Sequence, residues 1–510
     1  MSENQRHCPG EKYTISDAVC QGRRVRHYPK CKGCQFNDDE VQPKPPKVGN
    51  GAPIVDAIFK AYDVRGKVPG QINEDVAWRI GHAAAQYLLS TDEARRLTGD
   101  NAKAIVVGHD MRSSGQALMK ACSDGILATG ADCVSLGEIE TPAIYYAVGS
   151  LQAAGGIMIT ASHNPGDYNG FKITAAGVKP VGESSGLKDI QRIAQSIEQS
   201  GGPLKGKLRQ FDLSSGYIQH VRRFARDIKP MKIVMDASNG MGSKWTPSIL
   251  RDLAIDVVPL YFERSGRFVH EPNPLRDENV ADLKQKVIET QARLGVSFDG
   301  DADRCVILDE NGDRVGGDTL TALLAAEFLK AERGASIIYD LRSSWAVRET
   351  IESYGGVPRR ERVGHSFMKA TLRKYNAPFG GELSGHFYYR DNFYCDSGVI
   401  TLMKVLSVVS QSDAPLSGIL EPLRKYATTG EVNFHVEDKD EMIKQLARKF
   451  ADGKVDFLDG VTVEYGDWWF NCRKSNTEPL LRLIVEARSQ DVLDDKFAGL
   501  KAMLGEPANE

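Results

Sequence analysis

One pattern occurs three times in the chain and limits its possible folds more than any other feature. A short apolar stretch, an Asp, a small polar loop and a helical segment follow one another in AIVVGHDMRSS (104–114), KIVMDASNGMG (232–242) and SIIYDLRSSW (336–345). After each helical segment comes a second apolar or extended stretch. Strand, loop, helix and strand in this order are typical of a parallel α/β unit. Three copies about a hundred residues apart therefore predict three related α/β domains.

The two ends of the chain differ from this pattern. Strand-like and helical segments alternate near the C-terminus, at 431–438, 440–453, 461–476, 480–488 and 493–504. They predict a smaller α+β domain that begins near Tyr426. Residues 1–50 are polar and mildly basic, and the stretch Gln42–Pro53 has the Pro and Lys content of a stiff linker. We expect the following division: 1–50, a Cys-rich N-terminal segment and linker; 51–206, 207–313 and 314–425, α/β domains I, II and III; and 426–510, α+β domain IV.

The composition is that of an ordinary globular protein, with 41% hydrophobic and 26% charged residues in a chain of 510. A net charge of −3 gives no reason to expect binding to nucleic acid or to a membrane surface. The first residues lack the apolar core of a signal peptide, and no apolar run is long enough to cross a bilayer. We therefore expect a soluble, cytoplasmic protein.

The stretch ITASHNPGDYNGFKI (159–173) places Ser162 between a β-branched apolar strand and an Asn-Pro bend. A serine in that position can be an ordinary turn residue. It can also be a nucleophile held on a loop, provided that a base or a cation lies close to it. The stretch by itself leaves both interpretations open.

A second loop carries Asp299, Asp301 and Asp303, spaced two residues apart between two strand-like segments. Carboxylates this close repel one another unless a cation neutralises them, and such oxygen ligands suit Mg²⁺ or Ca²⁺. An EF-hand loop would need helices at its flanks and a glycine at its sixth position, where Arg304 stands. A solvated acidic turn is the other alternative. With three carboxylates, Mg²⁺ would keep open positions for a phosphate oxygen and waters.

Three further loops carry groups suited to a sugar phosphate. FKAYDVRG brings Arg65 and Lys60 close to the start of the first domain, which is a weak signal by itself. GGELSGHFYY offers Glu382, Ser384 and His386, which either bind adjacent sugar hydroxyls or lie in a plain loop.

The third loop, CRKSNTEPLLRL, offers phosphate donors or a helix cap; its polar residues are Arg473, Ser475, Asn476 and Thr477. The chain contains neither a Walker A loop nor a dinucleotide glycine fingerprint. A loop hydroxyl, a carboxylate site for Mg²⁺ and a second phosphate loop together predict phosphoryl transfer without ATP.

The motifs TASHNP, DGDADR, GELSGH and RKSNTEP occur in the order found in the α-D-phosphohexomutases, and the chain closely resembles that family from about Pro53 to its C-terminus. The resemblance implies four domains around a central cleft, three related α/β domains with mixed sheets and a C-terminal α+β domain. GELSGH resembles the sugar loop of the phosphomannomutase/phosphoglucomutase group, whereas phosphoglucosamine mutases usually carry Gln where Leu383 stands. The implied activity interconverts the 1- and 6-phosphates of mannose or glucose.

The resemblance also implies roles for individual residues. Ser162 would be phosphorylated in the resting enzyme, and its phosphate would bind Mg²⁺ together with Asp299, Asp301 and Asp303. The implied residues of the phosphoryl-transfer site are Arg65, His163, Lys172 and Arg304. The implied substrate-binding residues are Tyr62, Arg342, His365, Glu382, Ser384, His386, Arg473, Ser475, Asn476 and Thr477.

The implied mechanism passes through a glucose or mannose 1,6-bisphosphate, which would also act as activator. Arg342 departs from the family, whose members usually carry Lys there; a role in proton transfer would be in doubt because Arg does not titrate. The general base is left open among His163, Lys172 and His365. A phosphoglucosamine mutase, a non-catalytic sugar-phosphate sensor and a metal-dependent phosphatase are the competing functions. We expect hexose phosphates as partners and either a monomer or a homodimer.

Four of the nine cysteines lie in the first 34 residues, outside the part that resembles the family. Cys8, Cys20, Cys31 and Cys34 could form a structural zinc site, with His7 and His27 as alternative ligands. An iron–sulfur cluster or no metal at all are the alternatives. The other cysteines are scattered, which favours reduced, buried thiols.

Overall fold

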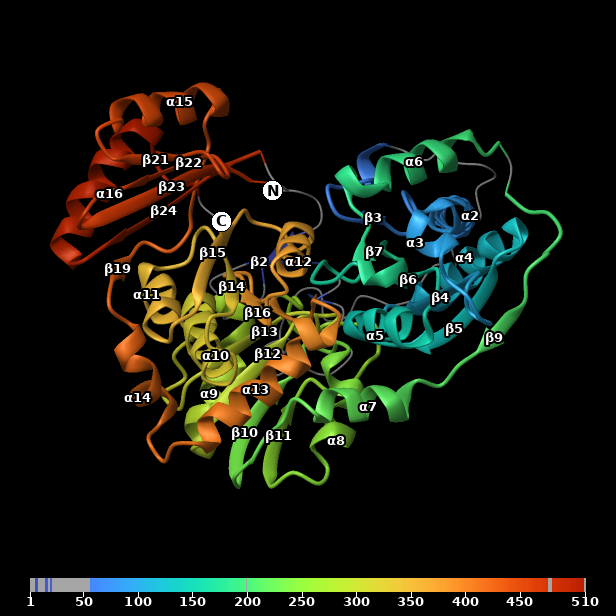
Figure 1. Cartoon of the computed structure of the whole chain (residues 1–510), viewed down its shortest axis with the longest axis horizontal. Coiled ribbons are helices and arrows are strands. Elements are labelled where there is room, and N and C mark those ends of the chain that lie inside the picture. Colours follow the sequence, from blue (N-terminus) through green and yellow to red (C-terminus); the bar gives the residue numbers. More distant parts are fainter. Residues whose placement is uncertain are drawn as a thin grey trace. The chain divides into compact units, whose positions relative to one another are not determined.

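The computed structural model describes residues 5–7, 14–16, 19–20, 56–198, 200–475 and 479–508 (Figure 1). These residues form two compact units. The first contains the described residues up to Val315 together with Gly385–Leu416, and the second contains Gly316–Ser384 and the described residues from Ser417 onward. The chain therefore passes from the first unit to the second, returns to the first, and ends in the second.

The first unit begins with a short antiparallel pair, β1 (Gln5–His7) and β2 (Thr14–Ser16). Domain I follows and is built on a mixed sheet with the strand order β3-β7-β6-β4-β5-β9, in which β8 pairs with β7. Strands β4, β5, β6 and β9 run parallel, while β7 is antiparallel to β3, β6 and β8. The strands are β3 (Val64–Lys67), β4 (Ala104–His109), β5 (Asp132–Glu138), β6 (Gly155–Ile159), β7 (Tyr168–Ala175), β8 (Lys179–Pro180) and β9 (Leu208–Gln210). The helices are η2 (Asp56–Ile58), α2 (Glu74–Ser90), α3 (Asp92–Arg95), α4 (Gly115–Thr129), α5 (Thr141–Leu151), η3 (Ala176–Val178), η4 (Glu183–Ser185) and α6 (Leu187–Ser196).

Helices cover both faces of this sheet (Figure 1). On one face, α2, α4 and α6 pack with alternate strand residues such as Ile105 and Ile157 into one buried core. On the other face, a Cβ at Gly156 would meet Val148 and Ile144 of α5. Burial on both faces explains why β4 and β6 consist almost entirely of apolar residues and glycine.

Domain II has a four-stranded mixed sheet with the order β11-β10-β12-β13. The first three strands are parallel, and β13 runs antiparallel to β12. The strands are β10 (Met231–Asp236), β11 (Ile255–Leu260), β12 (Leu294–Phe298) and β13 (Cys305–Leu308). The helices are α7 (Ser214–Arg222), α8 (Gly242–Leu250), η5 (Asp277–Val280) and α9 (Ala281–Thr290). Because strands β12 and β13 flank the three aspartates, the EF-hand alternative is excluded.

In the second unit, β14 pairs in parallel with both β15 and β16. The elements of this part are α10 (Gly317–Ala331), β14 (Ser336–Asp340), α11 (Trp345–Ser353), β15 (Val357–Glu361), α12 (His365–Lys374) and β16 (Phe379–Gly381). The segment that returns to the first unit carries an antiparallel strand pair and a buried helix: β17 (Phe387–Tyr389), η6 (Arg390–Asn392), β18 (Cys395–Asp396) and α13 (Gly398–Ser410). Helices α14 (Leu416–Leu420) and η7 (Glu421–Leu423) follow.

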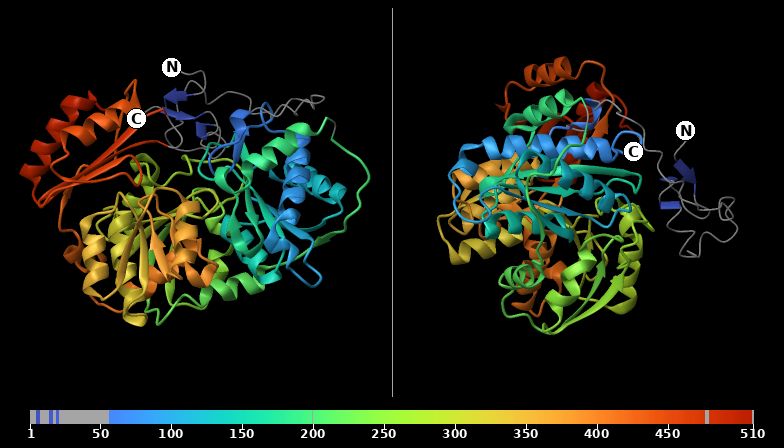
Figure 2. Two further views of the ribbon diagram at one scale, coloured as in Figure 1. Left: turned by 45° about the horizontal axis from the view of Figure 1, so that its top comes forward. Right: turned by 90° about the vertical axis from the view of Figure 1, so that its right-hand side faces the viewer.

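The C-terminal domain is an antiparallel sheet with two long helices (Figure 2). Its strand order is β19-β24-β23-β22-β21, with β20 paired to β24. The elements are β19 (Ala427–Thr428), β20 (Val432–Phe434), α15 (Lys439–Lys449), β21 (Lys454–Asp456), β22 (Val461–Glu464), β23 (Trp468–Lys474), β24 (Leu481–Ala487) and α16 (Gln490–Leu504). The prediction of three α/β domains with mixed sheets and an α+β domain is confirmed.

The three repeats share a detail at the end of their first strand. Asp110, Asp236 and Asp340 are completely buried. Each accepts, through Oδ1, the backbone N–H of the residue two positions later, at 3.0, 2.7 and 2.8 Å. Each Asp thereby closes a tight turn over the carboxyl end of its strand. Among the described residues, no helix is long and apolar enough to cross a membrane.

Candidate functional site

Ser162 lies on the loop between β6 and β7, and its backbone has the left-handed φ of 50° that non-glycine residues rarely adopt. The side chain is 2% exposed. Its Oγ donates to Asp299 Oδ2 at 3.1 Å and lies 3.2 Å from His163 Nδ1. The serine of the TASHNP motif therefore meets the first aspartate of the DGDADR motif.

The serine loop and the aspartate loop approach each other at Gly300. A Cβ at this position would lie 2.5 Å from the carbonyl oxygen of Ser162, closer than real contacts allow. The glycine between Asp299 and Asp301 thus permits the two loops to touch. The sequence prediction that these motifs act together is supported by this contact and by the Ser162–Asp299 hydrogen bond.

Asp299, Asp301 and Asp303 are buried, and oxygens of all three lie within 4.8 Å of one another. Burial and the carboxylates of Asp303 and Asp301 raise the pKa of Asp299 well above its ordinary value. Burial opposes ionisation of Asp303 as well, but Lys172 and His386 lower its pKa well below the ordinary range. Three buried carboxylates this close repel one another, which favours the binding of a cation among them.

One oxygen of this triad, Asp301 Oδ1, is buried and has no hydrogen-bond partner among the described residues. A buried carboxylate oxygen without a donor is costly unless a cation binds it. The triad offers the hard oxygen ligands that Mg²⁺ prefers, so the residues present fit this ion. The other oxygen of Asp301 accepts hydrogen bonds from Thr141 Oγ1 at 2.5 Å and Lys172 Nζ at 2.7 Å.

Several cations surround the serine and the triad. Lys172 Nζ also donates to Asp303 Oδ2 at 2.5 Å; burial opposes its charge, but Asp301 and Asp303 raise the pKa of the ammonium. Arg304 Nε lies 3.3 Å from Asp299 Oδ2, and its Nη2 is bonded to His163 Nδ1.

His163 is itself strongly affected by these charges. Burial, and then the cations of Arg304, Arg65 and Lys172, lower the pKa of its imidazole well below the ordinary value. Arg65, on β3, donates to Asn164 Oδ1 at 2.5 Å and to Asp63 Oδ2 at 2.5 Å. Arg65, His163, Lys172 and Arg304 therefore all lie around Ser162 and the aspartates.

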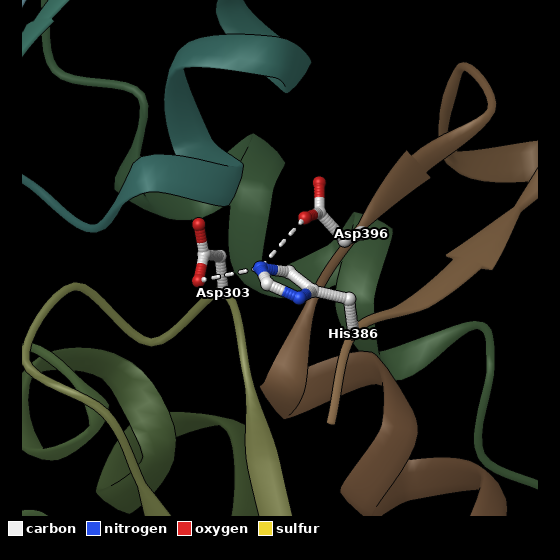
Figure 3. Close-up of side chains that lie close together, drawn as sticks. All are labelled: Asp303, His386 and Asp396. Carbon is white, nitrogen blue, oxygen red and sulfur yellow. Dashed lines mark ion pairs between the residues drawn. The ribbon is translucent and has the colours of Figure 1, made fainter. Parts of the chain in front are cut away.

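His386 joins this group from the returning segment of the chain. Its Nε2 lies 3.5 Å from Asp303 Oδ1 and 3.7 Å from Asp396 Oδ2, and Figure 3 shows the ring directed at both carboxylates. Asp396, at the end of β18, was not singled out from the sequence. Asp303 and Asp396 are buried, and the side chain of His386 is 14% exposed.

The second unit carries a separate group of cations. Arg342 follows β14 and donates to both carboxylate oxygens of Asp340, at 3.2 and 2.7 Å. Asp340 Oδ2 also accepts the N–H of Leu383 at 2.8 Å, which ties the turn after β14 to the GELSGH loop. Burial opposes the charge on Arg342, but Asp340 and Glu431 raise its pKa. Arg342 therefore stays charged.

Glu431 connects Arg342 with strands β23 and β24, which carry Arg473 and Arg482. Its carboxylate accepts from Arg473 Nη2 at 2.6 Å, from Arg342 Nη1 at 3.2 Å and from Arg482 Nη1 at 3.4 Å. Burial opposes ionisation of Glu431, but Arg342, Arg473 and Arg482 lower its pKa to about 2. Three guanidinium groups around one carboxylate place several N–H donors close together, which suits the binding of a phosphate.

The remaining predicted residues have these positions. Glu382 is buried directly after β16, with Ser384 two positions later, and His365 is the first residue of α12. Tyr62 is half-buried just before β3, and Ser475 follows β23, with its N–H bonded to the carbonyl of Leu480 at 2.9 Å. Asn476 and Thr477 lie outside the described residues, as do Cys8, Cys31 and Cys34; Cys20 is buried. The roles of all these residues, and the zinc site, stay predictions.

Other residues of these groups were missed in the sequence: Asp110, Arg112, Thr141, Thr160, Asp396 and Glu431. Their contacts join segments far apart in the chain, so local patterns gave little signal. One signal was present, because Arg112 occupies in DMRSS the position of Arg342 in DLRSS.

Family models match almost the whole of the chain beyond the N-terminal segment. They are described as Phosphoglucomutase/phosphomannomutase, alpha/beta/alpha domain I over 56–201, domain II over 215–312, domain III over 316–426, and C-terminal domain over 431–499. A phosphomannomutase of Vibrio cholerae is 37% identical over 459 residues, which are 88% of this chain and 98% of that protein. The chain belongs to the α-D-phosphohexomutase family.

Further relatives agree with this membership. A phosphomannomutase of Escherichia coli K12 is 35% identical over 443 residues, 84% of this chain and 94% of that protein. The crystal structure of a phosphoglucomutase/phosphomannomutase family protein from Burkholderia thailandensis is 32% identical with a TM-score of 0.78, covering 89% of this chain and 99% of that one. This phosphohexomutase is therefore an isomerase that acts on hexose phosphates, as the sequence motifs predicted.

Proposed function

We propose that this phosphohexomutase interconverts the 1-phosphate and the 6-phosphate of mannose, glucose or both by passing a phosphoryl group through Ser162. One observation carries the proposal above all others: Ser162 Oγ lies 3.1 Å from a carboxylate of the buried aspartate triad. A serine hydroxyl next to a site suited to a divalent cation can accept and return a phosphoryl group. The product would supply enzymes that make sugar nucleotides.

In the proposed reaction, phospho-Ser162 gives its phosphoryl group to O1 or O6 of the hexose monophosphate. The bond between phosphorus and Oγ breaks, the bond to the sugar oxygen forms, and the sugar hydroxyl loses its proton. The resulting 1,6-bisphosphate turns over and returns its other phosphoryl group to Ser162. Added glucose or mannose 1,6-bisphosphate would activate the enzyme by phosphorylating Ser162.

Asp299, Asp301 and Asp303 would hold Mg²⁺, which neutralises charge on the transferring oxygens when it is bound. Lys172 and Arg304 would add positive charge at the same place, because both contact the triad. Asp299 would hold the serine hydroxyl, and Arg65 would bind the substrate next to Asn164. His163 and His365 remain the candidates for the base that takes the proton, because Asp301 and Asp303 keep the third predicted candidate, Lys172, in its charged form.

The second unit would bind the rest of the substrate. Glu382 and Ser384 would bind sugar hydroxyls, and Arg342, Arg473 and Ser475 would bind the phosphate that is not transferred. The proposal rests on the cluster of guanidinium donors that Arg342, Arg473 and Arg482 form around Glu431. The same donors can serve both half-reactions, because in each half-reaction one of the two phosphates is not transferred.

Replacement of Ser162 by Ala tests the proposal. The variant is given mannose 1-phosphate or glucose 1-phosphate, Mg²⁺ and a trace of glucose 1,6-bisphosphate, and formation of the 6-phosphate is measured. We expect a loss of at least about a thousandfold in rate, because the phosphoryl carrier is gone. The matched control is Ser184→Ala, at an exposed serine of the same unit, which should keep the wild-type rate.

Near wild-type turnover in Ser162→Ala would overturn the proposal. Release of inorganic phosphate by the wild type without an isomeric product would indicate a phosphatase instead. Binding of hexose phosphates by the wild type with neither product would indicate a sugar-phosphate sensor. The ratio of kcat/KM for the two 1-phosphates gives the sugar preference.

A further inference from the structure

Arg112 is a buried cation that the proposed reaction does not use. It lies in the loop after β4, and its side chain is 0% exposed. Its Nε donates to Asp110 Oδ2 at 3.1 Å, and Asp110 is equally buried. A buried arginine of this kind is kept charged by its partners, and every one of its donors must be satisfied.

The other two nitrogens of Arg112 bind one target, the backbone of the serine loop. Nη2 donates to the carbonyl of Ser162 at 2.9 Å and to that of Asn164 at 2.6 Å. Nη1 donates to the carbonyl of Pro165 at 2.5 Å and to that of Tyr168 at 3.0 Å. One guanidinium group thus contacts the loop from the serine itself to the first residue of β7.

The backbone of Ser162 is held from its other side as well. Its N–H donates to Thr160 Oγ1 at 2.9 Å, and Thr160 Oγ1 donates to Asp110 Oδ2 at 2.7 Å. Asp110 therefore supports both groups that hold Ser162, namely Arg112 at the carbonyl and Thr160 at the amide. A serine with φ of 50° needs such support, because a left-handed non-glycine residue costs roughly 1–3 kcal/mol.

The other repeats of the fold show that the turn itself does not need this arginine. In domain II, Ser238 stands at the equivalent position, and its N–H still binds Asp236 Oδ1 at 2.7 Å. After β14, Arg342 makes the same turn, but its outer nitrogen contacts Glu431 instead of a loop backbone. The direction in which Arg112 points is therefore a specific feature of the repeat that carries Ser162.

From these contacts we propose that Arg112, supported by Asp110 and Thr160, is a positioning residue for phosphoryl transfer. It holds the Ser162 backbone so that Oγ stays next to the aspartate triad in both half-reactions. This inference rests on the proposed function, since it assumes that Ser162 carries the phosphoryl group. Lysine could not replace it, because an ammonium carries only three donors on one atom, whereas the guanidinium group reaches four carbonyls and Asp110.

The test compares Arg112→Lys with Arg79→Lys in the full-length enzyme. Arg79 is the matched control, because it is also a buried arginine of domain I, paired with Asp75 at 3.0 Å and without a contact to the serine loop among its ion pairs. We expect kcat of Arg112→Lys to fall about ten- to a hundredfold with KM changed less than about threefold, because about 1 Å of displacement at a reacting group costs about a hundredfold in rate. Arg79→Lys should keep kcat within about twofold.

A second readout separates positioning from general stability. Phospho-Ser162 that is poorly held should lose more of its phosphoryl group to water, so inorganic phosphate released per isomer formed should rise in Arg112→Lys. A lower melting temperature with unchanged kcat and unchanged phosphate release would overturn the proposal. So would an equal loss of kcat in Arg79→Lys.

If Arg112→Lys does not fold, the proposal is tested with two variants of its supporting residue, Thr160→Val and Thr160→Ser. Serine keeps the hydroxyl that joins Asp110 to the Ser162 amide, and valine removes it at a similar volume. We expect kcat to fall in Thr160→Val and to be largely restored in Thr160→Ser; equal kcat in both would overturn the proposal. An inactive Ser162→Ala with a fully active Arg112→Lys would reject only this inference, whereas an active Ser162→Ala would reject the proposed function.

Discussion

Gly300 shows how much the candidate site depends on single residues. It separates Asp299 from Asp301, and its missing side chain leaves room for the carbonyl oxygen of Ser162. The hydrogen bond from Ser162 Oγ to Asp299 depends on this close approach of the two loops. The glycine in DGDADR is therefore explained by its contact with the serine loop and not by its own backbone angles.

Gly300→Ala should separate the two loops. Its Cβ would start 2.5 Å from the Ser162 carbonyl, so the loops must move apart by several tenths of an ångström or more. We expect kcat to fall by about a hundredfold while the circular dichroism spectrum stays unchanged. Gly70→Ala is the control in the same unit, because no atom lies within 4 Å of its added Cβ. Equal kcat in the two variants would show that the approach of the loops has no catalytic importance.

The low pKa of Glu431 predicts how the stability of the fold depends on pH. The group titrates with a pKa of 4.5 when unfolded and about 2 when folded, because three arginines stabilise its charged form. A depressed pKa stabilises the fold above about pH 4.5, and this contribution, on the order of 3 kcal/mol, disappears as the pH falls towards 2. In Glu431→Gln the melting temperature should be lower at pH 7 and should depend less on pH below 4.5.

The matched control for this measurement is Glu437→Gln, at an exposed glutamate of the same unit. Thermal melts of both variants and the wild type at pH 7, 5, 4 and 3.5 would be compared. Parallel curves for Glu431→Gln and the wild type over that range would contradict the assignment of the low pKa to Glu431.

At the scale of elements, the sequence predicted the repeats and the loops that carry chemistry. The strand, Asp and loop pattern was visible because each piece is local, and the structure adds that each Asp closes its turn by binding the amide two residues later. The serine and aspartate motifs were paired from their chemistry, and the structure places Ser162 Oγ 3.1 Å from Asp299 Oδ2. Their contact at Gly300 needed coordinates, because it joins residues more than a hundred positions apart.

The sequence did not predict which tertiary contacts are made by equivalent elements of the repeats. Arg112 and Arg342 occupy equivalent turns, yet one binds a loop backbone and the other a glutamate. The segment Gly385–Leu416 was expected in the third α/β domain and lies within the family model of that domain, 316–426, while it forms one compact unit with the residues up to Val315. A short sequence pattern predicts the local turn but not the residues that the turn contacts, because these contacts depend on packing between distant segments.

At the scale of the whole molecule, the chain crosses between two units, and this limits where it can be divided. The first unit needs Gly385–Leu416, which carries β17, β18 and α13, so a fragment that ends at Val315 lacks part of its own unit. The C-terminal domain is different, because its six strands and two helices are continuous in sequence after Tyr426. It also has a hydrophobic core of its own, formed between the sheet and α15 and α16.

We therefore expect the fragment Tyr426–Glu510 to fold alone and the fragment Met1–Val315 to fail. The C-terminal fragment keeps its core, including Phe434, Phe470 and Leu500, and gives up the contacts of Trp469 and Ile484 with Trp345. It should show α+β circular dichroism, dispersed amide NMR signals and a cooperative thermal transition, at a lower temperature than in the full chain because those contacts are lost. Fragment Met1–Val315 should expose apolar surface that α13 covers and should aggregate or melt without cooperativity. A cooperative melt of Met1–Val315 together with an unfolded C-terminal fragment would contradict this assignment of independent folding.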